Sequence, residues 1–521
     1  MSSQWSMKCL RLAALAMSAC VLAACTPGSS SIEASTSESP NLSKALSSLP
    51  VQVQDLMGKT GVPGVAVAVV HDGTTTYAEG FGVANLDTGA KVDADTVFQL
   101  ASVSKPVGST VVATLVSDGT ISWQKPVQSL LPDFALGDPW VTSHLSVGDL
   151  YAHRSGLPDH AGDDLEWLGY DQTQILNRLR YLPLTPFRAS YAYTNYGIMA
   201  GALAAAAASG SDWPTLSDEA LYQPLGMNRT TSSFQQYIAM SNHSVGHERV
   251  NGSWRVTPEQ FNDDAATAAG GVASSVNDMA RWEAMVLGQG KSGDTQFMRS
   301  EALVQALFPH NLSKPLPPSA DKAPGQYGYG FGLAVNGLGH TVISHSGAFS
   351  QGAATFVGMI PASHLGIVVL TNGYPMGVAE TVGMTFLDNA EVGSPTADWW
   401  AIYSKAFASI RQPTGSLTSA TPPERATPSK PAAAYAGVYR NDYFGQAIVT
   451  QHQGSLTLAM GPQGQRRWAL HHWDGDTFTF TLAMPEVSDD SLSAVVFDTK
   501  RKTMTVEFYD DNGLGTFARM N

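Results

Sequence analysis

The chain has 521 residues, of which 43% are hydrophobic and 14% are charged, and its formal net charge at pH 7 is −14. This length and composition predict a globular protein with a substantial core and roughly two to four domains. The acidic balance, together with the lack of any Lys/Arg cluster in the sequence, excludes a nucleic-acid-binding protein, because phosphate binding needs clustered positive charge.

The N-terminus has the pattern of an export signal. A basic start precedes the apolar run "LAALAMSACVLAA", which is too short to span a bilayer comfortably. The run ends in "LAAC" at residues 22–25, which resembles a bacterial lipobox. This motif predicts cleavage before Cys25 and lipidation of its thiol. The alternative is a plain cleaved signal with an incidental cysteine.

The lipobox interpretation sets the expected location of the protein. It predicts a signal peptide over residues 1–24 and a flexible tether over 25–44. It also predicts no disulfide, since all three cysteines lie in the first 25 residues. Thr26 follows the cysteine, where an Asp would favour inner-membrane retention. We therefore expect a lipid anchor in the bacterial outer membrane, with the protein facing the periplasm.

The first large domain is predicted to be α+β. Residues 41–58 have the pattern of an amphipathic helix, and residues 64–89 have that of a β-hairpin with an Asp-Gly turn. A helix is expected over 102–118, and helices and long loops over 120–270. Strand patterns return in 341–373. Strands at both ends of a helical middle predict one antiparallel sheet with a mostly helical insertion.

A second, smaller domain follows a linker. The first domain is assigned to residues 45–411, and the segment 412–433 is rich in Pro, Ser, Thr and Ala, as linkers are. In residues 434–521 about eight strand-like pieces recur at short intervals, separated by turns. They predict a small all-β meander barrel, since closure removes exposed strand edges.

A Ser-x-x-Lys pattern, one candidate for nucleophilic chemistry, occurs three times, at Ser102–Lys105, Ser122–Lys125 and Ser319–Lys322. On a helix, residues three apart share a face, so that the amine can reach the hydroxyl. Ser102 can open a helix, with Pro106 in its first turn, where proline is tolerated. The second pair lies in a turn and the third lies among prolines. The context therefore favours Ser102 as nucleophile, with Lys105 beside it.

Two further segments carry groups that such a serine needs. Tyr193 and Asn195 precede a helical pattern; the phenol could take the serine proton if a neighbouring ammonium lowers its pKa, and the amide could hold the lysine and a substrate carbonyl. His345 ends a strand and is followed by Gly347, which lets a substrate lie alongside. The next backbone N–H, that of Ala348, can then face an oxyanion.

At this point the chain resembles the serine hydrolases related to class C β-lactamases, D-amino-acid-specific peptidases and β-lactamase-like esterases. The resemblance covers residues 45–395 and rests on an ordered series that includes "FQLASVSKPV", "LSVGDLYAHRSGLP", "FRASYAYTNYGIMAGAL", "AAGGVASSVNDMARW" and "ISHSGAFSQG". It implies the fold of β-lactamases and penicillin-binding proteins, and a C-terminal barrel similar to a lipocalin-like module. It also implies a set of roles: an acylated Ser102, a proton-moving pair of Lys105 and Tyr193, supporting groups in Asn195 and His345, and oxyanion donors in the N–H groups of Ser102 and Ala348.

The third motif departs from the lactamases of this family, which have a lysine where this chain has His345. A histidine with its ordinary pKa near 6.5 is mostly neutral at pH 7, whereas a lysine is a permanent cation suited to a substrate carboxylate. The sequence therefore predicts a serine hydrolase that cleaves a small ester or peptide bond through an acyl-enzyme. Which of the lysine and the tyrosine is the base stays open.

Other interpretations are a class C-like β-lactamase, acting on a β-lactam, or a catalytically silent, lipid-anchored binding or sensor protein. A further rival is "AFSQG", a near match to the nucleophile elbow, which would make Ser350 the nucleophile but requires a helix after it. The adjacent His471 and His472 lie on a predicted strand and so point to opposite faces. No metal and no organic cofactor is predicted.

Overall fold

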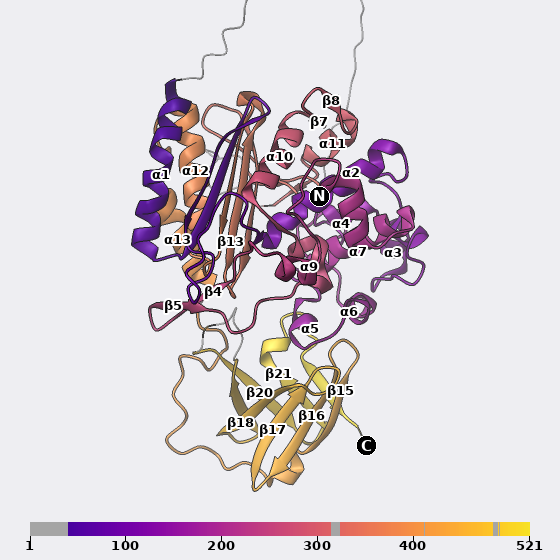
Figure 1. Ribbon diagram of the computed structural model, residues 1–521. Coiled ribbons are helices and arrows are strands. Elements are labelled where there is room, and N and C mark those ends of the chain that lie inside the picture. The colour runs from indigo at the N-terminus through magenta and orange to yellow at the C-terminus, as the bar shows by residue number, and fades with distance from the viewer. Residues whose placement is uncertain (1–39, 314–323, 411, 483–487, 489, 521) are drawn as a thin grey trace, which may run out of the picture. The chain divides into compact units, whose positions relative to one another are not determined.

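The structure is a computed structural model, and it describes residues 40–313, 324–410, 412–482, 488 and 490–520 (Figure 1). Tether residues 25–39, the signal peptide and Cys25 lie outside these residues. Within the part of the chain that is described, every helix is too short or too polar to span a bilayer.

An eight-stranded antiparallel sheet forms the centre of the first domain, as predicted. Its strand order is β2-β1-β14-β13-β12-β11-β10-β9, so the first two strands lie beside strands from the far end of the domain. For example, Val65 pairs with Thr371. The strands are β1 (Gly64–His71), β2 (Thr74–Gly82), β9 (Asn311–Leu312), β10 (Gln326–Tyr327), β11 (Gly332–Val335), β12 (Thr341–Phe349), β13 (Ala353–Ile360) and β14 (Leu365–Thr371).

Helices cover both faces of this sheet, which explains why β1 is apolar along its length. Val65, Val67 and Val69 enter one core, while Ala66 and Ala68 enter the other, because successive side chains of a strand point to opposite faces. On the first face lie α1 (Pro40–Thr60), α12 (Val378–Val392) and α13 (Trp399–Ile410), beside the sheet in Figure 1. On the other face, α10 (Val276–Leu287) packs against β1 and β14.

Helix α1 begins inside the segment that was predicted to be a tether, so the predicted end of the tether is too late. Residues 40–44, which were assigned to the tether, form the first turn of this helix. The helical conformation places Leu42 in the core beneath the sheet, where it is 3% exposed. Burial of a leucine side chain contributes about 2 kcal/mol, which offsets the entropy lost when the first turn orders.

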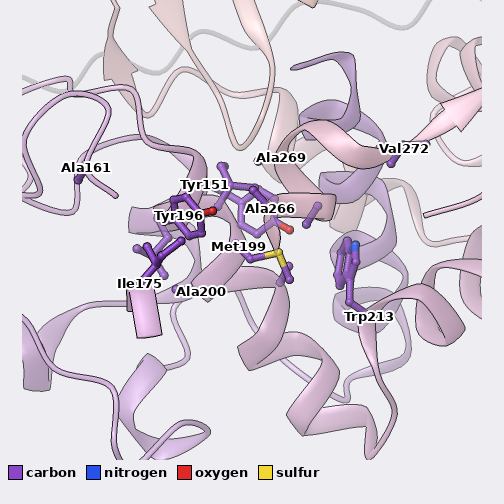
Figure 2. Packing of buried hydrophobic residues seen from close by; sticks show 14 of the residues in the cluster. Tyr151, Ala161, Ile175, Tyr196, Met199, Ala200, Trp213, Ala266, Ala269 and Val272 are labelled. Carbon is purple, nitrogen blue, oxygen red and sulfur yellow. The ribbon is translucent and has the colours of Figure 1, made fainter. Parts of the chain in front are cut away.

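The insertion is mostly helical, as the sequence predicts. Its centre is α7, the alanine-rich run, and Figure 2 shows Tyr196, Met199 and Ala200 packed among the side chains of neighbouring elements. Small residues let Tyr151 lie directly on α7, since a Cβ at Gly201 would stand 3.0 Å from its ring. The helices of this domain not yet named are α2 (Ser104–Asp118), α3 (Pro139–His144), α4 (Val147–Tyr151), α5 (Asp163–Trp167), α6 (Gln172–Arg178), α7 (Asn195–Ser209), α8 (Trp213–Ser217), α9 (Phe234–Ala239) and α11 (Ser300–Leu307).

Short elements complete the domain. Three two-stranded ribbons join β3 (Phe98–Gln99) to β6 (Ala273–Ser274), β4 (His247–Val250) to β5 (Ser253–Val256), and β7 (Lys291–Ser292) to β8 (Thr295–Gln296). The short helical turns are η1 (Ala101–Val103), η2 (Val127–Ser129), η3 (Leu179–Tyr181), η4 (Asp218–Tyr222), η5 (Asp264–Ala266), η6 (Thr267–Gly271) and η7 (Pro361–Ser363).

The C-terminal region is a closed eight-stranded antiparallel barrel, as predicted. Pairing of β15 with β22, in which Tyr439 lies opposite Arg519, closes it. The segment 412–431 before it contains neither helix nor strand. The elements are η8 (Ala432–Ala434), β15 (Gly437–Asn441), β16 (Gly445–His452), β17 (Ser455–Met460), β18 (Arg466–Asp474), β19 (Thr477–Thr481), β20 (Leu492–Asp498), β21 (Thr503–Val506), η9 (Glu507–Tyr509) and β22 (Thr516–Arg519).

Candidate active site

Ser102 lies in the tight turn η1, directly before α2. The preceding residue, Ala101, has a φ of 47°, in the left-handed region that alanine rarely adopts. Such a conformation costs on the order of 1 kcal/mol and persists only where the surroundings enforce it, as at functional sites. Lys105 follows in the first turn of α2, and its Nζ lies 3.0 Å from Ser102 Oγ.

The Lys105 amine is fully buried and lies within hydrogen-bond distance of three oxygens. These are Ser102 Oγ at 3.0 Å, Asn195 Oδ1 at 2.8 Å and the carbonyl of Ala269 in η6 at 2.9 Å. A neutral amine has two hydrogens and one lone pair. Because the amide and carbonyl oxygens can only accept, the two hydrogens go to them. The lone pair of the neutral amine then faces the serine hydroxyl.

Burial changes the pKa values of both groups beside the serine. It lowers the pKa of Lys105 to about 7, although the charges of Asp263 and Asp163 act to raise it. It raises the pKa of Tyr193 well above its usual range, despite the opposing hydrogen bond with Ser102. The condition under which the phenol could take the serine proton, a pKa lowered by a neighbouring ammonium, is therefore not met. At neutral pH the amine can accept a proton, and the phenol can only donate one.

Tyr193 and Asn195 reach the serine from the segment that leads into α7. Tyr193 Oη donates to Ser102 Oγ at 2.7 Å, and the Lys105 Nζ lies 4.5 Å from the centre of its ring. Asn195 Nδ2 donates to Asp163 Oδ2 at 3.1 Å, which fixes the amide with its oxygen toward the lysine. The hydroxyl, the amine and the phenol therefore meet at one point, although they lie up to 91 residues apart in the chain.

Strand β12 brings the third predicted segment to the same place. Gly347 has no room for a side chain, because a Cβ there would collide with the carbonyl of Leu100 and stand 2.9 Å from the backbone nitrogen of Ser102. The following residue, Ala348, lines the hollow in front of Ser102. His345 lies two residues before Gly347 on the same strand, and its Nε2 is 2.9 Å from Tyr327 Oη. Burial lowers the pKa of His345 to about 3, so the ring is neutral.

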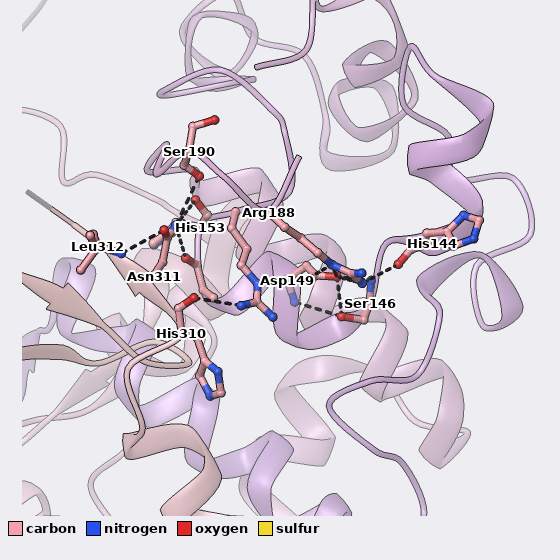
Figure 3. A network of polar contacts seen from close by, with 11 residues as sticks. His144, Ser146, Asp149, His153, Arg188, Ser190, His310, Asn311 and Leu312 are labelled. Carbon is pink, nitrogen blue, oxygen red and sulfur yellow. Dashed lines mark hydrogen bonds and ion pairs between the residues drawn. The ribbon is translucent and has the colours of Figure 1, made fainter. Parts of the chain in front are cut away.

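A polar network holds the segments around the tyrosine. Asp149 is fully buried and accepts hydrogen bonds from Ser146 and from Arg188, the latter at 2.7 Å (Figure 3). It also accepts one from Arg154. Burial alone would raise the pKa of Asp149, but these hydrogen bonds outweigh it and hold the pKa below its usual range.

Asn311 of β9 extends this support to the residues next to Tyr193. Its Nδ2 donates to the carbonyls of His153 and Ser190, as Figure 3 shows. The ring of His153 lies 4.6 Å from that of Tyr193, centre to centre. The network thus fixes the loop that presents the phenol.

The hollow in front of Ser102 has a volume of about 310 Å³ and an acidic wall. Asp163, Glu166 and Asp263 line it. Burial raises the pKa of Asp263 to about 7 and that of Glu166 well above its usual range, and the two carboxyls share a hydrogen bond. At neutral pH this pair therefore retains a proton. Among the described residues that line the hollow there is no lysine or arginine.

A second, more apolar hollow of about 400 Å³ lies next to the first. The two share Tyr374, Pro375 and Phe407 as lining residues. Trp400 and Phe407 come from α13, which packs against α12. The Nζ of Lys59, at the end of α1, stands 4.5 Å from the Trp400 ring. The aromatic hollow therefore borders the hollow in front of Ser102.

The rival serines lie elsewhere or in an unsuitable setting. Ser122 and Lys125 lie in a turn, and residues 319–322 lie outside the described residues. Ser350 lines the hollow, but β13 follows it in place of the helix that a nucleophile elbow needs.

Sequence reasoning missed several of the groups that line the hollow. The acidic loop at 159–166 has a visible charge pattern, which is equally typical of a solvated loop. Asp263 and Phe261 carry no local signal at all, because they reach the hollow through the fold of a segment almost 100 positions further along the chain. Phe407 lies in a helix beyond the resemblance.

The class of the protein follows from this geometry. An α+β fold that places a serine hydroxyl between a buried amine and a phenol is that of a serine hydrolase. The β-lactamase family model matches residues 52–385, and a domain of unknown function, DUF3471, matches residues 421–519. The chain therefore belongs to the β-lactamase family.

Similar proteins agree with this assignment. The chain is 27% identical to the unguisins hydrolase ungD of Aspergillus violaceofuscus over 81% of this chain and 80% of that protein. It is 29% identical to penicillin-binding protein 4 of Amycolatopsis lactamdurans, over 60% and 81%. The fold is similar to that of the octameric penicillin-binding protein homologue from Pyrococcus abyssi, with a TM-score of 0.57, 18% identity, and coverage of 89% of this chain and 98% of that one. The protein is a serine hydrolase. The barrel matches DUF3471, so its likeness to a lipocalin stays a prediction.

Proposed function

We propose that the protein cleaves an ester or amide bond through an acyl-enzyme on Ser102. As Oγ attacks the substrate carbonyl carbon, the neutral amine of Lys105 accepts the hydroxyl proton, and Tyr193 donates a hydrogen bond to Oγ. The observation that carries this proposal is the set of three contacts that the amine makes with Ser102 Oγ, Asn195 Oδ1 and the Ala269 carbonyl. Because the last two oxygens can only accept, they would take both hydrogens of a neutral amine and leave its lone pair for the serine.

The remaining steps use the same groups. The N–H groups of Ser102 and Ala348 would stabilise the negative oxygen of the tetrahedral intermediate. The Lys105 ammonium then returns its proton to the leaving group as the bond breaks. In deacylation the amine takes a proton from water as the water oxygen attacks the ester. Collapse of the second intermediate releases the acid, and the proton goes back to Ser102 Oγ.

The charges around Ser102 favour a substrate that is neutral or carries an amine near the scissile bond. Asp163, Glu166 and Asp263 line the hollow, whereas His345 is neutral and no lysine or arginine appears among the described lining residues. His160 also lines the hollow, and its hydrogen bond with Asp163 raises its pKa, but this ring is already paired with that carboxylate at 2.8 Å. A substrate carboxylate would therefore lack an unpaired cationic partner among the described lining residues and would face acidic groups. This arrangement favours ester or peptide hydrolysis over the class C-like β-lactamase alternative. The names of two relatives, a hydrolase of unguisins and a penicillin-binding protein, fit the proposed reaction class.

The second hollow extends the proposal to the shape of the substrate. Because Tyr374, Pro375 and Phe407 line both hollows, we infer that a substrate bound at Ser102 can place a bulky apolar group in the second one. Burial of such a group gains roughly 25 cal/mol for each Å² of apolar surface removed from water.

Covalent labelling tests the catalytic proposal against the silent binding protein. A fluorophosphonate probe should add its mass to the peptide that contains Ser102. The Ser102→Ala variant should lose this label, while the control Ser122→Ala should keep it. A folded protein that takes no label at Ser102 would support the binding or sensor interpretation instead.

A matched set of substrates tests the proposed charge preference. One amino acid p-nitroanilide is prepared with a free amine, with an N-acetyl group and with an N-succinyl group, so that only the charge near the bond changes greatly. We expect kcat/KM to be about tenfold lower for the succinyl compound than for the acetyl compound, since a desolvated, unpaired carboxylate loses on the order of 1.4 kcal/mol. A chromogenic cephalosporin should be turned over slowly. Equal rates across the three anilides would contradict the preference.

The location remains a proposal that rests on the sequence alone. The "LAAC" motif supports a lipid anchor at Cys25 in the outer membrane of a bacterial envelope, with the membrane as a partner. Metabolic labelling with an alkyne fatty acid should mark the protein expressed in a bacterium. The Cys25→Ala variant should be unlabelled and should leave the membrane fraction. Equal labelling of both would contradict the anchor.

A further inference from the structure

The C-terminal barrel contacts a short segment of the catalytic domain, residues 162–170, which contains α5. Four hydrogen bonds join them, and they lie at both ends of the segment. The Gly162 N–H donates to Tyr443 Oη at 3.1 Å, Arg466 Nε donates to the Trp167 carbonyl at 2.7 Å, Gln465 Nε2 donates to the Leu168 carbonyl at 2.9 Å, and Tyr170 Oη donates to the Phe444 carbonyl at 2.7 Å. In addition, the Arg466 guanidinium stands 5.8 Å from the centre of the Trp167 ring.

Glycines allow this close approach. Gly461, with a φ of 95°, lies so near the Leu168 carbonyl that a Cβ would collide with it. Gly445, with a φ of 76°, lies in the same way against Tyr170 Oη. The contact is therefore made by backbone at close range, which leaves the segment little freedom to move relative to the barrel.

The segment 162–170 also forms part of the acidic wall of the hollow in front of Ser102. Asp163, Glu166 and Trp167 all belong to α5 and line that hollow. A helix of five residues has no stability of its own, so its position depends on tertiary contacts. Leu165, which is fully buried, belongs to the main hydrophobic core. The barrel provides the bonds described above.

We propose that the barrel is a positioning element of the active site. Its residues Tyr443, Gln465 and Arg466 hold the wall that receives the part of the substrate next to the scissile bond. They act on substrate binding through Glu166 and Trp167, and they leave the chemistry at Ser102 and Lys105 unchanged. The barrel matches a domain family of unknown function, and the proposal assigns it a role. The proposal rests on the proposed function only for the identity of the reaction.

The test compares neighbouring arginines in the full-length protein. The variant Arg466→Ala combined with Gln465→Ala removes two of the four bonds. The control Arg467→Ala removes an exposed arginine whose Nε bonds Gly464 within the barrel. Kinetics are measured with an aryl acetate, which is too small to need the wall, and with an N-acetylated dipeptide p-nitroanilide, which is large enough to contact it.

We expect KM for the larger substrate to rise about tenfold in the double variant, because two hydrogen bonds of roughly 0.5–1.5 kcal/mol each no longer fix the wall. In the double variant, kcat for the larger substrate and kcat/KM for the acetate should stay within about twofold of the values for the starting protein. The control variant should match the starting protein on both substrates. Equal loss on both substrates, or no difference from the control, would overturn the proposal.

Hydrogen exchange provides a readout that does not need turnover. Backbone amide hydrogens in peptides covering residues 162–170 should exchange faster in the double variant than in the starting protein. In the control variant their exchange rate should be unchanged. The milder Tyr443→Phe variant, which removes only the acceptor of the Gly162 N–H, should raise exchange at that end alone. Unchanged exchange in every variant overturns the proposal even where no substrate is cleaved. A failure of the starting protein to take a fluorophosphonate label refutes the proposed function instead.

Discussion

The pKa of Lys105 makes the rate of acylation depend on pH in a defined way. With a pKa of about 7, roughly half of the amines are neutral at pH 7, against fewer than about 1 in 1,000 for a lysine with the ordinary value. Only the neutral amine can accept the Ser102 proton. The rate of covalent labelling by a fluorophosphonate should therefore rise with pH, with a midpoint near 7, and fall about tenfold for each pH unit below about 6.

The assay is the second-order rate constant of labelling at Ser102 between pH 5 and 9, which reports the first chemical step alone. Lys105→Arg should lower this constant at least about 1,000-fold at every pH, because a guanidinium stays charged. Lys125→Arg, taken from the rival Ser-x-x-Lys pair, should leave the profile unchanged. A constant that is independent of pH from 5 to 8, or a midpoint near 10, would refute the assignment of the amine as base.

One further variant separates Lys105 from Asp263, whose pKa is also raised to about 7 by burial. If the aspartate were the titrating group, Asp263→Asn would remove the rise of rate with pH. If the lysine is that group, the rise remains and its midpoint moves to lower pH, by up to about one unit, because the charge of Asp263 acts to raise the lysine pKa. The two outcomes differ in kind, so the measurement decides between them.

Three other predictions concern single groups. Tyr193→Phe should lower kcat at least about 100-fold and change KM less than about threefold, measured with an aryl ester and compared with Tyr191→Phe. Asp149→Asn should lower the free energy of unfolding by about 3 kcal/mol at pH 7, measured with urea. Because the folded pKa of Asp149 is depressed, its stabilisation is present above the unfolded value near 3.9 and is lost as pH falls through the folded value, so the difference between the two proteins should shrink as the pH falls below about 3.9. Phe407→Ala should reduce the gain in kcat/KM along a series of p-nitrophenyl esters from acetate to octanoate, while Phe308→Ala, on an exposed aromatic residue, should not.

The sequence predicted the parts of the site that depend on local order. Ser102 lies in the turn before α2 and Lys105 in the first turn of that helix, and this spacing of three brings the amine to the hydroxyl. Tyr193 and Asn195 lie two apart before another helix, so that both reach the same place. The sequence left the direction of the tyrosine pKa open, because it depends on how completely the surrounding chain buries the ring.

The parts that the sequence could not predict depend on which surfaces meet. Strand alternation shows that residues 434–521 form a barrel, but it does not show which of the outward side chains contact another domain. Arg466 and Arg467 are adjacent and chemically alike, yet only Arg466 reaches the catalytic domain. Helix α13 poses the same problem, since its amphipathic pattern does not say that Phe407 faces Ser102.

The acidic wall links the strength of the base to the choice of substrate. Burial lowers the pKa of Lys105, and the charges of Asp263 and Asp163 act against that shift, so the balance near neutral pH exists only because both are present. The same carboxyls disfavour an anionic substrate, and the neutral His345 offers such a substrate no compensating charge. A chain with a lysine at 345 would add a cation close to Lys105 and lower its pKa further. The histidine therefore suits a site in which burial alone already makes the amine a base, and in which the substrate brings no carboxylate to be neutralised.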